Sequence, residues 1–131
     1  MAKILLAEDD AAIRDFVRLA LEMDKHEVVA VHDGQEALER LLADADAYDL
    51  LLTDIRMPIT DGVTLVQQIA DIVPNLPVLV MTGYAGDYNE EKVFSQQVRG
   101  IITKPFTLES IRSEITSALA GGGKVEQAVS Y

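Results

Sequence analysis

Short apolar runs alternate along the chain with longer stretches in which apolar residues recur every three or four positions. The runs are almost continuously apolar, as in Ile4-Leu5-Leu6-Ala7 and Val78-Leu79-Val80-Met81. Such runs are typical of parallel strands whose sheet is covered on both faces. We therefore expect five strands, over residues 3–7, 27–31, 49–53, 77–81 and 100–103.

The stretches between the runs have the spacing of amphipathic helices. They predict helices over residues 11–23, 34–43, 62–73 and 108–120, and Pro74 is expected to stop the third. A further helix around residues 88–97 rests chiefly on Val93 and Phe94. The apolar stripes of the first two helices consist of Ile13, Phe16, Val17, Ala20 and Leu21, and of Ala37, Leu38, Leu41 and Leu42. Five strands alternating with five helices predict a doubly wound α/β domain with right-handed crossovers.

Length, composition and charge narrow the possible classes. The 131 residues suggest one domain, which we expect over residues 1–120, followed by a flexible tail over 121–131 that opens with three glycines. There is no cysteine for a disulfide or thiolate metal site, and no apolar run approaches the ~18 residues of a membrane span. The net charge of −11 argues against non-specific binding to nucleic acid. A cytoplasmic location is expected.

Polar side chains stand where four of the predicted strands end. Glu8 and Asp9 follow the first strand, Asp54 the third, Thr82 the fourth and Lys104 the fifth. Each alone has an ordinary explanation, such as a helix cap, a turn hydroxyl or a surface lysine. Together they should converge, because the carboxyl ends of parallel strands share one edge of the sheet. Clustered carboxylates at such an edge need a cation and suit Mg²⁺.

This set of groups fits phosphoryl transfer to a carboxylate. Asp54 would be the nucleophile, Lys104 would neutralise it and then hold a phosphoryl oxygen, and Thr82 would donate a hydrogen bond. A metal-dependent phosphatase with an aspartyl nucleophile is an alternative, although it would usually need a second acid at the position of Arg56. A pure binding module would leave Lys104 and the acids unexplained. A nucleotide-binding protein is disfavoured, because no glycine-rich loop follows the first strand.

The ordered motifs resemble the receiver domain of two-component response regulators, the CheY-like family. They are Glu8-Asp9-Asp10, Asp54 with Met57-Pro58 and Asp61-Gly62, Thr82-Gly83, and Lys104-Pro105-Phe106, within residues 1–120. The resemblance implies a flavodoxin-like sheet of strand order 2-1-3-4-5, which is the order that such doubly wound folds share. It also implies the site roles: Asp54 as phosphoacceptor, Glu8, Asp9, Asp54 and the main-chain carbonyl of Arg56 as Mg²⁺ ligands, Lys104 as the site lysine and Thr82 as the switch hydroxyl.

Three strings are also similar to CpdR-type single-domain regulators of alphaproteobacteria, namely residues 4–10, 50–58 and 81–85. This resemblance implies a histidine kinase or histidine phosphotransfer protein as phosphodonor, and a protein target such as the ClpXP protease, an ATP-dependent protease, whose substrate delivery would be controlled. A phosphorelay intermediate is the alternative. Either would be a signalling protein that catalyses only its own phosphoryl transfer and slow autodephosphorylation, with no nucleic acid or membrane partner.

A few positions depart from the family pattern. Ile101 stands where many receivers have Tyr or Phe, so we expect output to depend on Thr82 and on residues 83–88, with the weak fourth helix rearranging. Arg56 and Tyr84 flank the phosphoryl position and are expected to slow its hydrolysis. Lys25 lies in a turn where glycine would more easily adopt a positive φ.

Overall fold

The computed structural model describes residues 1–57, 62–83 and 97–120. Its five strands form one sheet in the order β2-β1-β3-β4-β5, and every neighbouring pair is parallel. The doubly wound, flavodoxin-like fold and its strand order are therefore confirmed. The strands are β1 (Lys3–Ala7), β2 (Glu27–Val31), β3 (Leu50–Asp54), β4 (Val78–Thr82) and β5 (Val98–Thr103).

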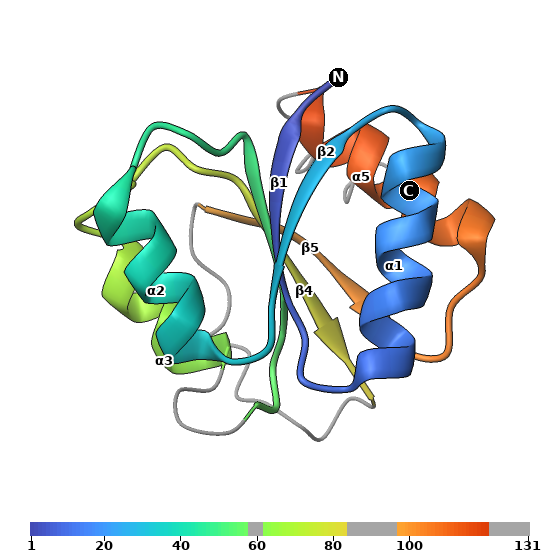
Figure 1. Cartoon of the computed structure of the whole chain (residues 1–131), viewed down its shortest axis with the longest axis horizontal. Helices are drawn as coiled ribbons and strands as arrows, with labels where there is room; N and C mark the ends of the chain where they lie inside the picture. Colours follow the sequence, from blue (N-terminus) through green and yellow to red (C-terminus); the bar gives the residue numbers. More distant parts are fainter. Residues whose placement is uncertain (58–61, 84–96, 121–131) are drawn as a thin grey trace.

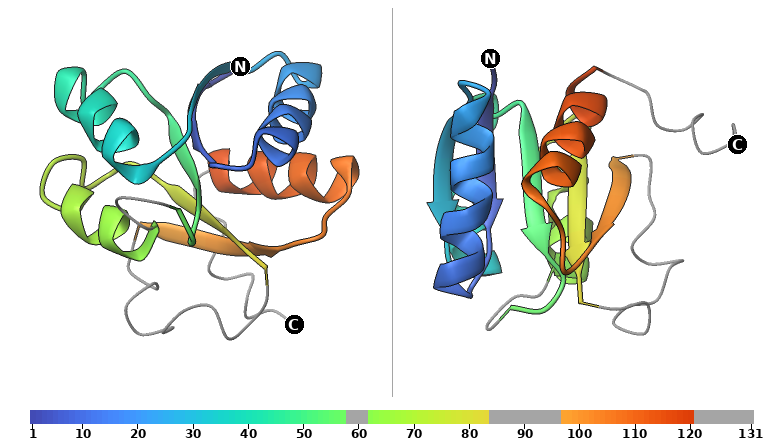
Figure 2. Two further views of the ribbon diagram at one scale, coloured as in Figure 1. Left: turned by 60° about the horizontal axis from the view of Figure 1, so that its bottom comes forward. Right: turned by 90° about the vertical axis from the view of Figure 1, so that its right-hand side faces the viewer.

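Helices cover both faces of this sheet. Figure 1 shows α2 (Gly34–Ala43) and α3 (Gly62–Ile69) on one face, with α1 (Ala11–Met23) and α5 (Leu108–Leu119) on the other. Figure 2 shows the same three layers from two further sides. The helix expected around residues 88–97 falls outside the described residues apart from Gln97, as does the expected tail over 121–131.

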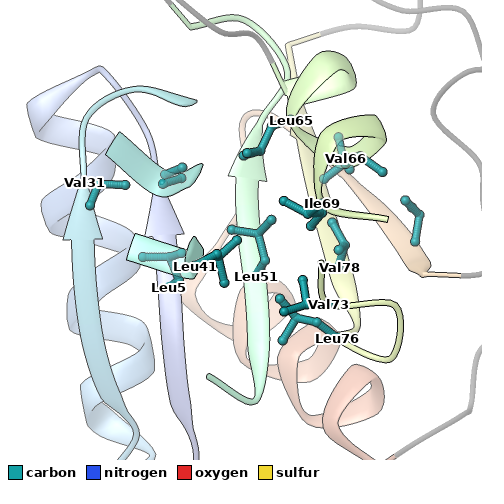
Figure 3. Packing of buried hydrophobic residues seen from close by; sticks show 14 of the residues in the cluster. Leu5, Val31, Leu41, Leu51, Leu65, Val66, Ile69, Val73, Leu76 and Val78 are labelled. Atoms are coloured by element: carbon teal, nitrogen blue, oxygen red, sulfur yellow. The ribbon is translucent and has the colours of Figure 1, made fainter. Parts of the chain in front are cut away.

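In β1 to β4, alternate residues enter two separate cores. Leu51 and Val78 pack under α2 and α3, in the cluster that Figure 3 shows. Leu52 and Met81 pack on the other face, under α1 and α5. Burying one such side chain stabilises the fold by roughly 1.5–3 kcal/mol. A one-residue slip of a strand would exchange the two sets, so this alternation fixes which side chains stand at the strand ends.

The predicted boundaries are confirmed within one or two residues, except at the end of α3. That helix ends at Ile69 instead of residue 73, and the chain then turns, with the N–H of Val73 bonded to the carbonyl of Ile69 at 2.9 Å. Pro74 has no N–H to bond the carbonyl of Ala70 and disfavours a helical backbone at Val73, so the helix ends before the position predicted for it. The buried side chain of Gln97 holds the segment that follows, since its Nε2 donates to the carbonyls of Val73 and Leu76 at 2.6 and 3.1 Å.

Two members of the predicted apolar stripes do not enter the core. Phe16 is 37% exposed and Leu42 is 60% exposed. The ring of Phe16 instead lies beside that of Phe106, with 6.1 Å between centroids. Both residues border their stripes, where helical spacing alone does not distinguish a core position from a neighbouring surface position.

Asp10 caps the amino end of α1 and directly follows Glu8 and Asp9. Its side chain accepts hydrogen bonds from the N–H groups of Ala12 and Ile13 at 2.9 and 3.2 Å, so it is the cap of this helix. At the other end of α1, Lys25 has φ of 69°, which confirms the expected positive φ in that turn.

Candidate functional site

The carboxyl ends of β1 and β3 bring three acids together. Ala7 and Thr53 are register partners, so the next residues, Glu8 and Asp54, lie side by side at the edge of the sheet. Carboxylate oxygens of Glu8, Asp9 and Asp54 all lie within 4.8 Å of one another. Glu8 and Asp54 are buried and Asp9 is exposed, which leaves the cluster open on one side.

Lys104 supplies the positive charge of this cluster. Its Nζ lies 3.0 Å from Glu8 Oε1 and 3.0 Å from Asp54 Oδ2, so one ammonium donates to both buried carboxylates. The backbone N–H of Lys104 donates to the carbonyl of Thr82 at 2.7 Å, which joins the ends of β4 and β5. The following bond, to Pro105, is cis. Residues from three strand ends therefore meet around one lysine.

Burial controls the electrostatics of the cluster. It raises the pKa of the Glu8 carboxyl to about 7; the N–H of Asp10 opposes the rise and the charge of Asp54 adds to it. Burial also works to lower the pKa of Lys104, but its hydrogen bonds and charge interactions with Glu8 and Asp54 are stronger together, and the pKa is raised. Lys104 thus stays charged. Its single positive charge cannot neutralise all the acids of the cluster.

The donor set fits a hard divalent cation. Three carboxylates of different residues present oxygens within one small volume, and such oxygens are the ligands that Mg²⁺ prefers. A divalent charge would also offset the repulsion from Asp54, which adds to the effect of burial on the pKa of Glu8. The residues predicted as metal ligands from the sequence are therefore brought together, with Arg56 two residues beyond Asp54 in the loop after β3.

The remaining predicted site residues lie at or near the same edge. Thr82 is the last residue of β4 and is 1% exposed. Ile101 is half-buried in β5 and packs against the core under α2 and α3. Tyr84 lies outside the described residues, and the expectations for residues 83–88 and for phosphoryl shielding remain predictions.

Sequence reasoning missed Arg14. Its guanidinium donates to the carbonyls of Glu8 and Asp9, at 2.9 and 3.4 Å. A signal was present in the sequence: a cation in the first turn of a helix opposes the helix dipole and so calls for a local partner. A second group, His32, Asp33 and Glu36, gathers at the end of β2, where Asp33 also caps α2.

None of the helices in the described ranges is long and apolar enough to cross a membrane.

Comparison with known proteins gives a consistent result. The family model for the response regulator receiver domain matches residues 4–116. The response regulator receiver protein CpdR of Brucella abortus is 36% identical over 119 residues, covering 91% of this chain and 98% of that protein. The response regulator protein FleR of Pseudomonas aeruginosa is 36% identical over 110 residues, covering 84% of this chain and 23% of FleR.

Solved structures give the same answer for the fold. A response regulator receiver domain protein from Clostridium thermocellum superposes with a TM-score of 0.83 and 26% identity, over 92% of this chain and 95% of the other. The chemotaxis response regulator CheY4 of Vibrio cholerae superposes with a TM-score of 0.75 and 27% identity, over 90% of this chain and 98% of the other. Receiver domains are signalling domains that generally bind Mg²⁺ and receive a phosphoryl group from histidine kinases on an aspartate. This chain belongs to the response regulator receiver domain family.

Proposed function

We propose that this protein is a single-domain response regulator that accepts a phosphoryl group on Asp54 from a histidine kinase or a histidine phosphotransfer protein, with Mg²⁺ as cofactor. The observation that carries the proposal is the Lys104 ammonium held 3.0 Å from both Asp54 and Glu8 at a buried sheet edge. Among the described residues, Asp54 combines burial, a bound ammonium and two neighbouring acids. The proposal includes a cytoplasmic location.

The proposed reaction transfers the phosphoryl group between two side chains. A carboxylate oxygen of Asp54 forms the new bond to phosphorus as the phosphorus–nitrogen bond of the donor histidine breaks, and the electron pair stays on the imidazole nitrogen, which is then protonated. Lys104 restrains the carboxylate beforehand and afterwards donates to a phosphoryl oxygen. Thr82, at the end of the adjacent β4, is the proposed donor to another of these oxygens.

The metal site in this proposal uses the carboxylates of Glu8, Asp9 and Asp54 and the main-chain carbonyl of Arg56. The support for it is the distance of at most 4.8 Å between oxygens of the three acids. When bound, Mg²⁺ neutralises negative charge that develops on the phosphoryl oxygens. The protein's part is to keep the ligand oxygens converged, because Mg²⁺ tolerates little deviation from octahedral geometry.

The phosphodonor is proposed to approach across α1. Three of the exposed large apolar residues in the described part of the chain, Phe16, Leu19 and Met23, lie on this helix. A groove of about 500 Å³ runs between α1 and the loop that carries Lys104. It is lined by Ala12, Ile13, Phe16, Lys104, Pro105 and Phe106. An apolar surface that borders the phosphoacceptor site suits a partner that must bring a histidine to it.

The proposed output is a change in binding to a protein target. Residues 1–120 would form the receiver and residues 121–131 a tail, and the receiver would respond through its own surface. Similarity to CpdR supports a more specific proposal, control of substrate delivery to a ClpXP-type protease. Phosphorylation would act by shifting a two-state population toward the form that binds the target better.

Phosphotransfer from a small-molecule donor tests this function. Purified protein is incubated with acetyl phosphate and Mg²⁺, and the intact mass is measured. We expect a phosphoryl adduct that is absent in Asp54→Ala and in the presence of EDTA. Asp46→Asn, which changes an exposed acid near the opposite end of the sheet, is the matched control and should be phosphorylated like the parent. An adduct on Asp54→Ala would refute the assignment, and steady turnover of phosphomonoesters would favour the phosphatase.

A further inference from the structure

We propose that Arg14 is a positioning residue for the metal site: its guanidinium holds the backbone of Glu8 and Asp9 so that their carboxylates converge on Mg²⁺. The inference rests on the proposed function in so far as Mg²⁺ is the cation of this site. Arg14 itself is not a ligand in this proposal, because its charge is positive and its contacts are with main-chain oxygens.

One guanidinium nitrogen makes both contacts. Nη1 of Arg14 lies 2.9 Å from the carbonyl oxygen of Glu8 and 3.4 Å from that of Asp9. The backbone of Arg14 is itself fixed, because its N–H donates to the carbonyl of Asp10 at 2.9 Å in the first turn of α1. The side chain therefore extends from a fixed helix and restrains the peptide groups that contain the carbonyls of Glu8 and Asp9.

Asp9 is the acid that needs this support. The Glu8 carboxylate is already restrained, since Oε2 accepts from the N–H of Asp10 at 3.0 Å and Oε1 accepts from Lys104. The N–H of Glu8 is also bonded, to the carbonyl of Val31 at 3.1 Å. Asp9 is exposed, and its carboxylate has no hydrogen bond to any residue that the structure describes. Its direction is therefore set by its backbone, which Arg14 holds.

The position of Arg14 in the helix supports the same conclusion. The N-terminal turn carries the positive end of the helix dipole, where an arginine is unfavourable and an acidic residue favourable. The first turn of α1 contains no acidic residue, and Arg14 stands at its end. The carbonyl oxygens of Glu8 and Asp9 offset the unfavourable interaction of the Arg14 guanidinium with the helix dipole. The loop that Arg14 restrains therefore also stabilises Arg14.

The charge and the hydrogen bonds of Arg14 should affect Mg²⁺ binding in opposite directions. A nearby positive charge repels a cation, so its removal alone would tighten binding. Loss of the bonds to Glu8 and Asp9 would let the ligands move and weaken binding. Groups that orient metal ligands typically contribute about 10–100-fold to affinity, whereas the charge of Arg14, which is half-buried and not fully enclosed, is partly screened by solvent. We therefore expect weakening to dominate.

Calorimetric titration of the full chain with Mg²⁺ tests this expectation. Arg14→Met, which keeps the length of the side chain without its donors, should raise the Kd for Mg²⁺ about 10-fold. Arg14→Lys, which can still donate one hydrogen bond, should recover part of the loss. Arg18→Met is the matched control, because Arg18 lies one turn along the same helix and pairs with Glu22. Its Kd should equal that of the parent. Unchanged or tighter binding by Arg14→Met would overturn the proposal.

Amide hydrogen exchange in metal-free protein provides a second readout that does not depend on phosphorylation. The N–H of Asp10 should exchange faster in Arg14→Met, because it belongs to the same peptide group as the Asp9 carbonyl, which Arg14 would no longer hold, and Arg14→Lys should restore part of the protection. Equal exchange in the parent and Arg14→Met would contradict the positioning role. If exchange and Mg²⁺ affinity change as expected but Asp54 accepts no phosphoryl group, the proposed function fails and the role of Arg14 stands.

Discussion

Two lysines at opposite ends of the sheet have similar acidic neighbours and very different surroundings. At the amino end, Nζ of Lys3 lies 3.9 Å from Glu27, and the backbone N–H of Lys3 donates to Asp49 at 2.8 Å. The side chains of Lys3 and Glu27 are 34% and 71% exposed. At the carboxyl end, Nζ of Lys104 lies 3.0 Å from two carboxylates whose side chains are 0% and 8% exposed. Residue types alone would not separate these groups.

The difference in burial separates an ordinary ion pair from a tightly coupled cluster of charges. An exposed pair is solvated whether or not it forms, so it contributes little to stability and leaves ordinary charge states. A buried lysine and two buried carboxylates are stabilised mainly by one another, because water does not solvate them. Removing a partner at the carboxyl end should therefore have large effects, and the same change at the amino end should have almost none.

The largest expected effect is on phosphotransfer. Lys104→Met removes the ammonium that neutralises Asp54, and we expect the rate of phosphorylation by acetyl phosphate to fall roughly 10²–10³-fold, as when one preorganised donor is lost from other sites. Lys3→Met, the matched change at the amino end, should leave the rate unchanged. Rates from intact-mass time courses decide the matter. Equal losses in both variants would mean that burial does not distinguish the two ends.

The next effect is on stability, through Glu8. Its pKa of about 7 lies above the usual value of 4.5, so the folded metal-free protein binds more protons than the unfolded chain between these pH values. The free energy of unfolding should therefore fall as pH rises from about 5 to 7, by up to about 3 kcal/mol. Glu8→Gln should remove this fall.

Urea unfolding followed by circular dichroism, in EDTA at pH 5, 6 and 7, measures the contribution of Glu8. Glu27→Gln is the control from the exposed pair, and its pH dependence should run parallel to that of the parent. Parallel curves for the parent and Glu8→Gln would show that the buried carboxyl does not resist ionisation.

An exposed pair between α1 and α5 should show the opposite pH dependence. A hydrogen bond from Arg112, at 2.7 Å, lowers the pKa of Asp24, and the charge of Arg112 acts in the same direction. A lowered pKa stabilises the fold at pH values above the unfolded pKa, and the gain is lost as pH falls below that value and through the folded pKa. Arg112→Met should thus lower Tm slightly at pH 7 and less at pH 3. A larger Tm loss at pH 3 would contradict this sign.

The sequence predicts the sheet and the site well for one physical reason. Apolar runs fix where strands end, and parallel topology then places Glu8, Asp54 and Lys104 at one edge, without any knowledge of loop conformation. The burial that distinguishes Lys104 from Lys3 does not follow so directly. It depends on packing around the sheet edge, which the spacing of apolar residues does not specify.

The failures come from contacts between side chains and backbone. Gln97 bonds the carbonyls of Val73 and Leu76, a long-range contact between a side chain and the backbone that no local pattern predicts. Arg14 was missed in the same way, because its partners are main-chain oxygens. A contact between two side chains is the further case: Phe16 belongs to the predicted apolar stripe of its helix, but it is partly exposed and lies beside Phe106.

The smallest expected effect completes the comparison at the amino end. Glu27→Gln removes the carboxylate that lies 3.9 Å from Lys3, and we expect the free energy of unfolding at pH 7 to change by less than about 0.5 kcal/mol. The ring of Tyr48, whose centroid is 5.3 Å from Nζ of Lys3, remains to receive the ammonium. Urea unfolding at low and moderate salt measures the change. Even at low salt, where screening is weakest, the change should stay below about 0.5 kcal/mol. A loss above 1 kcal/mol would mean that the amino end also holds a tightly coupled ion pair, and that burial is not what separates the two lysines.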